Sequence, residues 1–430
     1  RNRFERIGGN LLINLQSDEN PKVRQVGGKA ASLIRLTQAG FSVPTGSVLT
    51  TAYFAPWVEQ IEHQPRWHHV LSALNDIRTP QPNAKDRESL TRACDELKQT
   101  TTEFTFTQGQ RTALDKVRLD TADHRFAIRS SSPEEDLANA SFAGLYETVL
   151  NVTSDTLEAA VVQCFRSCLD ARVLFYKREM KFDQISPSIA VVVQRQIESD
   201  VAGVAFSINP LNNDFDELLI NASWGLGEAL VSGDITPDSL VFDKVDGHLI
   251  ESHRGDKGGL RSDEDCLNRA QTLALAEAVS RIETLYEEPV DVEWSFFEND
   301  LYVLQARPIT TYVPLAKELQ TEPGTQRKLY FDRSLADGMT MSGPISPLTI
   351  DGIEVPLREL VAYVIPGFNP DDIDLAEAGI NVSGSRIYMN LSMYMPLMKS
   401  EVMTNLMASI NTCLLYTSPS PRDLSTSRMP

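Results

Sequence analysis

The chain has 430 residues, enough for two or three domains with a sizeable core. Apolar residues make up 42% and charged residues 23%, as in globular proteins, and no apolar run approaches the ~18 residues of a membrane span. The net charge of −19 argues against nucleic acid or anionic membranes as partners, but not against a small polyanion in a local basic pocket.

The five cysteines are scattered and suggest no disulfide framework. Cys164 and Cys168 stand four apart in a predicted helix, where we expect two half-buried structural thiols rather than a metal or redox pair. This cysteine usage favours a reducing cytoplasm, and we expect no signal peptide.

The N-terminal part begins with a glycine turn. The stretch "VGGKAASLIRLTQAG" predicts that turn, then a helix over about 29–39, with Gly40 as its stop. Further helical patterns cover 51–62, 84–100 and 108–118.

A strand over 125–130 follows. Ser132, Pro133 and Glu135 then have the spacing of a capping box, which predicts the start of a helix. After a second strand in "YETVLNV", a long amphipathic helix is predicted over about 154–181.

From about residue 188 the chain changes to short β-rich runs, "SIAVVVQRQI", "VAGVAFSIN" and "DELLINASW". A helix near 266–287 then precedes a hairpin over 290–307. Strands that alternate with helices predict a mixed fold, α/β or α+β, in two lobes.

One face of the predicted hairpin "VDVEWSFFENDLYVLQARPIT" is polar and the other is apolar. A three-residue loop over 298–300 would set these residues opposite one another: Phe297 and Leu301, Glu293 and Gln305, Asp291 and Arg307. A carboxylate beside an amide oxygen suits Mg²⁺, which prefers hard oxygen ligands. The alternative is a solvated strand face with an Asp291–Arg307 pair.

Two other stretches could hold an anion. Lys29 follows two glycines at the start of a helix, where backbone N–H groups and the helix dipole favour an anion. An ordinary glycine turn is the alternative there. Arg129 ends a strand beside several hydroxyl residues, and its planar guanidinium suits bidentate phosphate contact. The alternative for this arginine is an ion pair with Glu134, Glu135 or Asp136.

Taken together, these candidate residues predict a nucleotide site more strongly than any one of them does. A nucleoside triphosphate would need two or three cations, a Mg²⁺ site and a glycine-bearing lid. Gly144 and Thr148, in "SFAGLYET", could supply the lid, because glycine lets a backbone approach a ligand closely.

Several blocks in the same order resemble the ATP-binding module of the phosphoenolpyruvate synthase and pyruvate phosphate dikinase superfamily. They are "GGKAASL", "FAIRSSSPEEDLANASFAGLYET", "VAGVAFSINP", "ASWGLGEALVSGDITPD" and "LYVLQARPIT", and the resemblance covers about residues 7–311. It implies an α+β fold of the ATP-grasp type, whose two lobes, expected over 1–187 and 188–311, clamp ATP. It also implies dikinase chemistry, in which ATP is split to AMP and phosphate and one phosphoryl group is relayed through a histidine on a swivelling domain.

Carried over position by position, the resemblance implies these roles: phosphate contact and catalysis for Lys29, Arg129 and Arg307, the lid for Gly144 and Thr148, the adenine pocket for Gln194, and Mg²⁺ binding for Glu293 and Gln305.

Residues 312–328 have the composition of a linker. The segment 329–411 resembles the start of the acceptor-binding domain of rifampicin phosphotransferase-type enzymes, which implies a second, mostly helical domain. The tail over 412–430 is expected to be non-native, because part of it resembles a translated sequencing adapter, and the natural protein is expected to continue.

No histidine stands in the sequence context of the family's phosphocarrier; the six lie at 63, 68, 69, 124, 248 and 253. We therefore expect a chain that binds ATP and Mg²⁺ but lacks the relay residue. Its acceptor is expected to be an organic hydroxyl compound or, in a phosphoenolpyruvate synthase fragment, pyruvate. A non-catalytic ATP-binding module and an ATP-grasp ligase that forms ADP are the remaining alternatives.

Overall fold

The chain divides into two compact units in a computed structural model. The first contains residues 1–207, 219–240 and 251–310, and the second contains 208–218, 241–250 and 311–430. The structure describes residues 10–77, 83–120, 124–134, 147–180, 185–212, 214–227, 233, 235–257, 261, 263–309, 312, 319, 328–332, 346, 349, 352, 355, 358–359, 369, 376, 379–383, 386–394 and 415–417. Among the helices of these ranges, none is both long and apolar enough to cross a membrane.

The first unit contains a five-stranded antiparallel sheet in the order β1-β2-β5-β3-β4. Its strands are β1 (Leu12–Asn14), β2 (Gly46–Leu49), β3 (Phe126–Ser131), β4 (Thr148–Val152) and β5 (Ala190–Arg195). The lobe boundary predicted between 187 and 188 would assign β5 to the second lobe. Instead, the hydrogen bonds of β5 to β2 and β3 place it at the centre of the first sheet.

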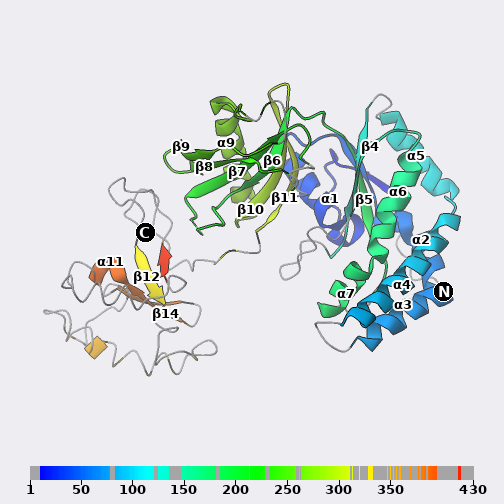
Figure 1. The fold of residues 1–430 in the computed structure, drawn as a ribbon, viewed down its shortest axis with the longest axis horizontal. Coiled ribbons are helices and arrows are strands. Elements are labelled where there is room, and N and C mark those ends of the chain that lie inside the picture. Colours follow the sequence, from blue (N-terminus) through cyan, green and yellow to red (C-terminus); the bar gives the residue numbers. More distant parts are fainter. Residues whose placement is uncertain are drawn as a thin grey trace. The chain divides into compact units, whose positions relative to one another are not determined.

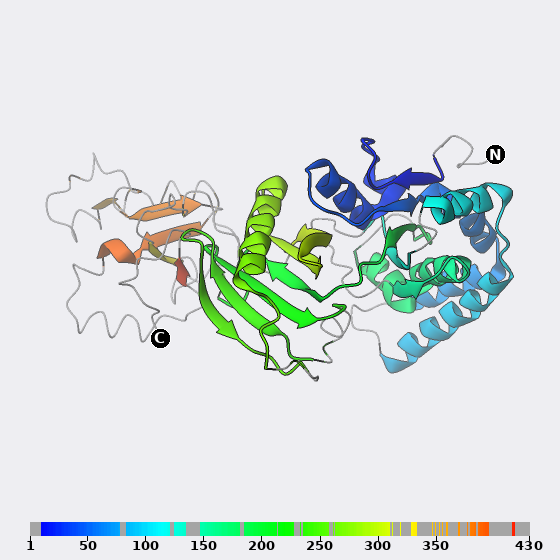
Figure 2. The same cartoon turned by 90° about the horizontal axis from the view of Figure 1, so that it is seen from above.

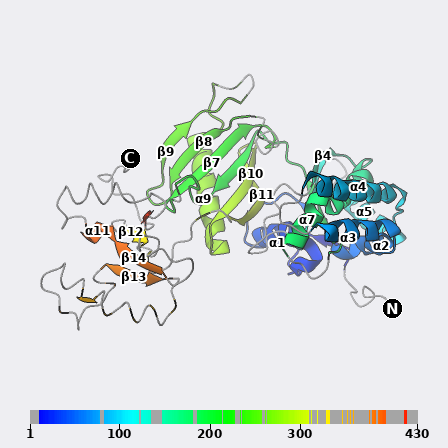
Figure 3. The same ribbon diagram turned by 60° about the horizontal axis from the view of Figure 1, so that its bottom comes forward.

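Helices cover one face of this sheet (Figures 1 and 3). They are α2 (Thr51–Glu62), α3 (Pro65–Asp76), α4 (Ala84–Thr100), α5 (Gln108–Asp120), α6 (Leu157–Arg166) and α7 (Ala171–Glu179), with short 3₁₀ helices η1 (Thr101–Glu103) and η2 (Ser167–Leu169). Phe126 and Ile128 of β3 lie in the apolar core that these helices share with the sheet. Since side chains alternate along a strand, Ala127 and Arg129 point to the opposite face.

The prediction of a single helix over 154–181 is wrong. The structure has α6, η2 and α7 there, and Asp170 interrupts the helical backbone between η2 and α7. This residue has extended backbone angles, φ −66° and ψ 138°. Its carboxylate accepts a hydrogen bond from Lys98 Nζ at 2.5 Å, which ties the break to α4. A tertiary contact to a distant helix therefore overrides the local helical pattern.

The four cysteines of the described residues are free and buried: Cys94, Cys164, Cys168 and Cys266. Burial is the main reason that the pKa of each thiol is raised to about 12. Cys164 and Cys168, expected to be half-buried, are fully buried. Both belong to the helical core, as their structural interpretation requires.

A second sheet has the strand order β11-β10-β6-β7-β8-β9. Its strands are β6 (Val201–Phe206), β7 (Glu217–Trp224), β8 (Asp238–Asp243), β9 (His248–His253), β10 (Val290–Phe297) and β11 (Asp300–Pro308). Helix α9 (Arg269–Tyr286) packs against β10 and β11 (Figure 2). The mixed helix-and-sheet fold predicted from the sequence is thus confirmed, and so is the apolar face of the hairpin, whose Val290, Val292, Trp294 and Phe296 are buried.

Helix α1 (Val23–Gln38) packs against β3 and β5 of the five-stranded sheet and against β11 of the hairpin. Gly27, with φ +79° and ψ 168°, interrupts its helical backbone. Regular helix begins after this kink, close to the predicted start at residue 29. A side chain at Gly27 would strain the backbone, because L residues rarely adopt such a positive φ.

Within the described part of 328–430, the elements are mainly strands. They form a four-stranded sheet, β13-β14-β12-β15, made of β12 (Leu329–Asp332), β13 (Ile380–Ser383), β14 (Arg386–Asn390) and β15 (Leu415–Thr417), followed after β14 by the short helix α11 (Leu391–Tyr394). The sequence predicts mostly helix here, but most of the intervening residues lie outside the described ones. Strand β15 falls in the tail expected to be non-native and pairs with β12.

Candidate functional site

Arg129, near the end of β3, bonds directly to the hairpin of the second sheet. Its Nη2 donates to Glu293 Oε2 at 2.5 Å and to Gln305 Oε1 at 3.1 Å. Its Nη1 donates to the backbone oxygen of Leu304 at 2.6 Å. The guanidinium is largely buried, with 11% of the side chain exposed. A cation from one sheet thus meets three acceptors from the other.

Of the alternative ion-pair partners considered for Arg129, the structure describes only Glu134, and Glu134 contacts other residues. Glu134 accepts a hydrogen bond from Ser132 Oγ at 2.5 Å and pairs with Lys177 Nζ at 3.2 Å. Residues 135 and 136 lie outside the described ones, as does most of the helix predicted to start there; Pro133 and Glu134 form a turn.

The hairpin has the predicted polar pairs, but its turn and its strand register differ from the prediction. Its tip is a two-residue turn, Glu298 and Asn299, both with positive φ, as such turns require. Phe297 therefore pairs with Asp300, and the predicted Phe297–Leu301 pair is wrong. A β-bulge between Glu293 and Trp294 then shifts the register by one residue. The shift restores the predicted pairs Glu293–Gln305 and Asp291–Arg307.

This bulge also supplies an acceptor that the sequence analysis missed. Val303 and Gln305 have partners on β10, and Leu304 between them is the extra residue. Its carbonyl is the one that accepts the Arg129 bond. The sequence signal for this bulge was the asparagine at the hairpin tip, because asparagine favours a two-residue turn. Such a turn shifts the register by one residue relative to the predicted three-residue loop. Only a bulge could then still set Glu293 opposite Gln305.

Lys29 lies beside the same carboxylate. Its Nζ donates to the backbone oxygen of Ser130 at 3.1 Å, and its side chain is buried with the glycine turn. Burial acts to raise the pKa of Glu293, but the charges of Arg129 and Lys29, with the Arg129 hydrogen bond and the charge of Arg307, outweigh it. The pKa of Glu293 therefore lies below its usual value, and the group is a carboxylate at neutral pH.

The serines after Arg129 hold the glycine turn in place. Ser131 Oγ accepts from the Ala30 N–H at 3.0 Å and donates to the Val26 oxygen at 2.8 Å. The Gly28 N–H donates to the backbone oxygen of Ser132 at 2.9 Å. The N–H groups of Gly28 and Ala30, in the turn where the sequence analysis expected an anion, are therefore already bonded within the protein.

Asp291 and Arg307 form the ion pair that was the structural alternative for this strand face. Arg307 Nε donates to both carboxylate oxygens, at 2.8 and 2.9 Å. Burial raises the pKa of Asp291 to about 6, although the charge and hydrogen bond of Arg307 act to lower it. The polar face thus carries both the predicted carboxylate–amide pair and this ion pair, one step along the hairpin.

The remaining predicted residues lie at different distances from the cluster. Thr148 is directly opposite Arg129 on β4 and is exposed. Gln194 is buried on the same sheet face as Arg129, and its amide donates to the Pro44 oxygen at 3.1 Å. Gly144 lies outside the described residues.

Two cavities of the first unit differ in their position relative to this cluster. One, of about 560 Å³, follows α1 and is lined among others by Gly28, Ser32, Arg35, Tyr286 and Ala306. The other, of about 380 Å³, is lined among others by Asn14, Gly46, Phe126 and Val193. Neither is lined by Lys29, Arg129 or Glu293, so charge and hydrogen bonding distinguish the cluster, not its volume.

The oxygens of Glu293 and Gln305 fit a small hard cation. Both lie within hydrogen-bonding distance of a single nitrogen, Arg129 Nη2, so they converge on one point. One is a carboxylate with a lowered pKa and the other an amide oxygen, a donor set that suits Mg²⁺. With only two protein ligands, such an ion would share its remaining positions with water and phosphate.

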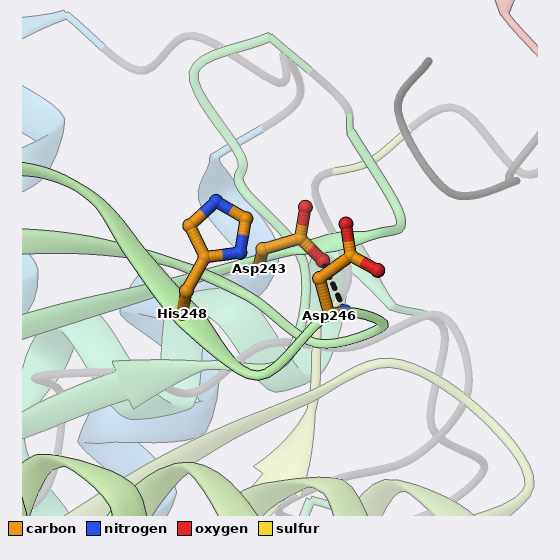
Figure 4. Close-up of side chains that lie close together, drawn as sticks. All are labelled: Asp243, Asp246 and His248. Atoms are coloured by element: carbon orange, nitrogen blue, oxygen red, sulfur yellow. Dashed lines mark hydrogen bonds between the residues drawn. The ribbon is translucent and has the colours of Figure 1, made fainter. Parts of the chain in front are cut away.

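A second group of possible metal ligands among the described residues is Asp243, Asp246 and His248, whose ligand atoms lie within 4.8 Å of one another (Figure 4). Asp243 ends β8, His248 begins β9, and Asp246 lies in the turn between them. Asp243 Oδ1 accepts the N–H groups of Val245 and Asp246, at 2.8 and 2.9 Å. The buried carboxylate therefore stabilises the turn, which accounts for its position.

The chain matches the family model described as "Pyruvate phosphate dikinase, AMP/ATP-binding domain" over residues 23–327. The chain belongs to this family. The match includes every predicted site residue, and it confirms the resemblance drawn from the sequence.

Curated relatives agree with this assignment. A probable phosphoenolpyruvate synthase of Methanothermobacter thermautotrophicus is 36% identical over 320 residues, 69% of this chain and 45% of the relative. An uncharacterized phosphotransferase of Bacillus subtilis is 32% identical over 385 residues, 84% of this chain and 43% of the relative. The rifampicin phosphotransferase of Bacillus subtilis is 29% identical over 358 residues, which is 79% of this chain and 40% of the relative. The chain thus spans less than half the length of these relatives.

Proposed function

We propose that the cluster around Arg129 and Glu293 binds ATP with Mg²⁺. The observation that carries this proposal is the convergence of Arg129, Glu293 and Gln305, from two separate sheets, beside Lys29. Two cations suit the charge of a triphosphate, and a carboxylate–amide pair suits its metal. The family's AMP/ATP-binding domain supports the same ligand.

Each residue then has a role that follows from its chemistry. Lys29 and Arg129 bind the phosphates and neutralise charge as a phosphoryl group moves. Arg307 adds a third cation, whose availability depends on its pair with Asp291. Glu293 and Gln305 hold Mg²⁺, which supplies further charge neutralisation when bound. Thr148 beside Arg129, with Gly144, contributes to the lid, and Gln194 lies at the adenine end.

We further propose that the chain is the ATP-binding half of a dikinase-type phosphotransferase. ATP would be split to AMP and phosphate, with one phosphoryl group relayed through a histidine supplied from outside these residues. The names of the relatives, phosphoenolpyruvate synthase and phosphotransferase, support this class.

The extent of the similarity favours an organic hydroxyl acceptor, as in rifampicin phosphotransferase. The two phosphotransferase relatives match 84% and 79% of this chain, whereas the phosphoenolpyruvate synthase relative matches 69%. The phosphotransferase similarity therefore covers more of the chain. Phosphoenolpyruvate synthase, with pyruvate as acceptor, is the second candidate, because that relative has the higher identity at 36%.

Two experiments test these proposals. Calorimetric titration of this chain with a nonhydrolysable ATP analogue and Mg²⁺ should give saturable binding, and Glu293→Gln should weaken it about tenfold or more, equivalent to ~1.4 kcal/mol. Arg125→Gln, a charge change at an exposed residue that bonds Asn151, is the control. Product analysis of the full-length protein with candidate acceptors should then detect AMP. Formation of ADP instead would contradict the dikinase assignment, and absence of analogue binding would contradict the site.

A further inference from the structure

Lys177, on the inner side of α7, is a buried cation for which the proposed chemistry has no use. Its side chain is 1% exposed, and its Nζ pairs with Glu134 Oε1 at 3.2 Å. Nζ also donates to the Ser186 backbone oxygen at 3.2 Å. An apolar pair of similar shape is often as stabilising as a buried ion pair, so stability alone is a weak reason for a lysine here.

Glu134, the ion-pair partner of Lys177, is connected to the glycine turn by hydrogen bonds. The second carboxylate oxygen of Glu134 accepts the Ser132 hydroxyl at 2.5 Å. The backbone oxygen of Ser132 accepts the N–H of Gly28 at 2.9 Å, directly before Lys29. Three consecutive contacts therefore connect Lys177 to the backbone that carries Lys29.

The other contact of Lys177 leads to the neighbouring strand. Ser186 precedes β5, and the first residue of β5, Ala190, pairs with Ser131 at the end of β3. Lys177 thus bonds to both chain segments that adjoin this end of the sheet. Arg129 lies on the same strand, two residues before Ser131.

The glycine turn packs tightly against the end of β3. A Cβ atom added to Gly27 would lie 2.2 Å from the Ser131 oxygen. A small movement of the β3 end would therefore move the glycine turn as well, because densely packed groups transmit displacement.

We propose that Lys177 is a positioning residue for the phosphate-binding groups. By holding Glu134, and through it Ser132, it sets the position of Lys29 relative to Arg129. The inference rests on the proposed ATP site, but it concerns a residue that touches neither nucleotide nor metal.

The test compares ion pairs in the full-length protein. Lys177→Met combined with Glu134→Gln replaces the buried pair with neutral groups of similar size and leaves no charge unpaired. The matched control is Lys98→Met with Asp170→Asn, another ion pair of the helical part, at 2.5 Å, with no contact to the glycine turn. Lys177→Arg keeps the charge and tests for rescue.

For the Lys177/Glu134 variant we expect the KM for ATP to rise about tenfold or more. Hydrogen exchange in the 23–38 peptide should accelerate, and the melting temperature should match that of the control pair. Lys177→Arg should recover much of the affinity, and the Lys98/Asp170 variant should keep the wild-type KM. A wild-type KM in the Lys177/Glu134 variant, or an equal rise in the control, would overturn the inference.

Affinity for a nonhydrolysable ATP analogue separates this inference from the proposed reaction. If the wild-type protein binds the analogue but forms no AMP, the reaction is wrong, and the analogue affinity of the variants still decides the role of Lys177. If the variant is poorly folded, Lys177→Arg decides: near-wild-type affinity for the analogue supports the inference, and an affinity reduced tenfold or more in the folded Lys177→Arg protein contradicts it.

Discussion

Arg129 and Glu293 stand 164 positions apart in the chain, and Nη2 of the first lies 2.5 Å from Oε2 of the second. Gln305 Oε1 lies 3.1 Å from the same nitrogen. The atoms proposed to hold Mg²⁺ and the guanidinium proposed to hold phosphate are thus in direct contact. A change in either residue therefore affects the proposed role of the other.

Replacement of Arg129 should impair turnover far more than folding. Arg129→Gln removes the charge proposed to stabilise the moving phosphoryl group, so we expect AMP formation to fall on the order of 10²–10³-fold. The measurement is steady-state AMP formation by the full-length protein, with circular dichroism to report folding. An Arg129→Gln protein with wild-type AMP formation would refute the role.

The same substitution should strengthen metal binding in the absence of nucleotide. Arg129 bonds to both proposed ligand oxygens and repels a divalent cation, so its removal should raise the affinity for Mn²⁺ about tenfold or more. Electron paramagnetic resonance of free Mn²⁺ measures this directly. Glu293→Gln, which removes a ligand, should show the opposite change, and equal Mn²⁺ affinity in wild type and Arg129→Gln would contradict the metal site.

Gly27→Ala should disrupt the glycine turn. The added Cβ would lie 2.2 Å from the Ser131 oxygen, and the φ of +79° is unfavourable for alanine. Gly40→Ala is the matched control, because Gly40 has a φ of +83° but no atom within 4 Å of an added Cβ. Thermal unfolding should show a larger loss for Gly27→Ala, with weaker binding of the ATP analogue. Equal losses would show that backbone strain alone matters and that the Ser131 contact does not.

Asp291 should make stability depend on pH in a defined direction. Its pKa is raised from 3.8 to about 6, so the folded protein holds this proton to a higher pH than the unfolded chain does. The contribution of this group to the free energy of unfolding therefore falls as pH rises from about 4 to about 6 and is level above that range. The total change is at most ~3 kcal/mol, since one pKa unit is worth about 1.4 kcal/mol.

Urea unfolding at a series of pH values checks this effect. Asp291→Asn cannot titrate, so the free energy of unfolding of the wild type should fall relative to the variant between pH 4 and 6. A constant difference across this range would show that the pKa of Asp291 is not raised on folding.

The thiols of Cys164 and Cys168 should be inert in the folded protein. Burial raises the pKa of both to about 12, so almost no thiolate exists at pH 8. Titration with a chromogenic disulfide reagent should label them only in denaturant. Fast labelling of either residue in the native protein, located by mass spectrometry, would contradict their burial.

Sequence alone determined the features that depend on local periodicity. Alternation with a period of two placed Val290 and Val292 on one face of the hairpin and Glu293 on the other, whatever packs against them. The glycine turn and the start of its helix were equally local, because glycine adopts a positive φ such as that of Gly27 more readily than other residues do. The mixed fold class followed from the same kind of pattern.

The tertiary structure decided which groups meet. Nothing near Arg129 in the chain indicated whether it would pair with Glu134 or with Glu293, because an ion pair forms wherever packing brings opposite charges together. The break at Asp170 and the burial of Lys177 have the same origin. Each depends on contacts between segments remote in sequence, which local pattern does not encode.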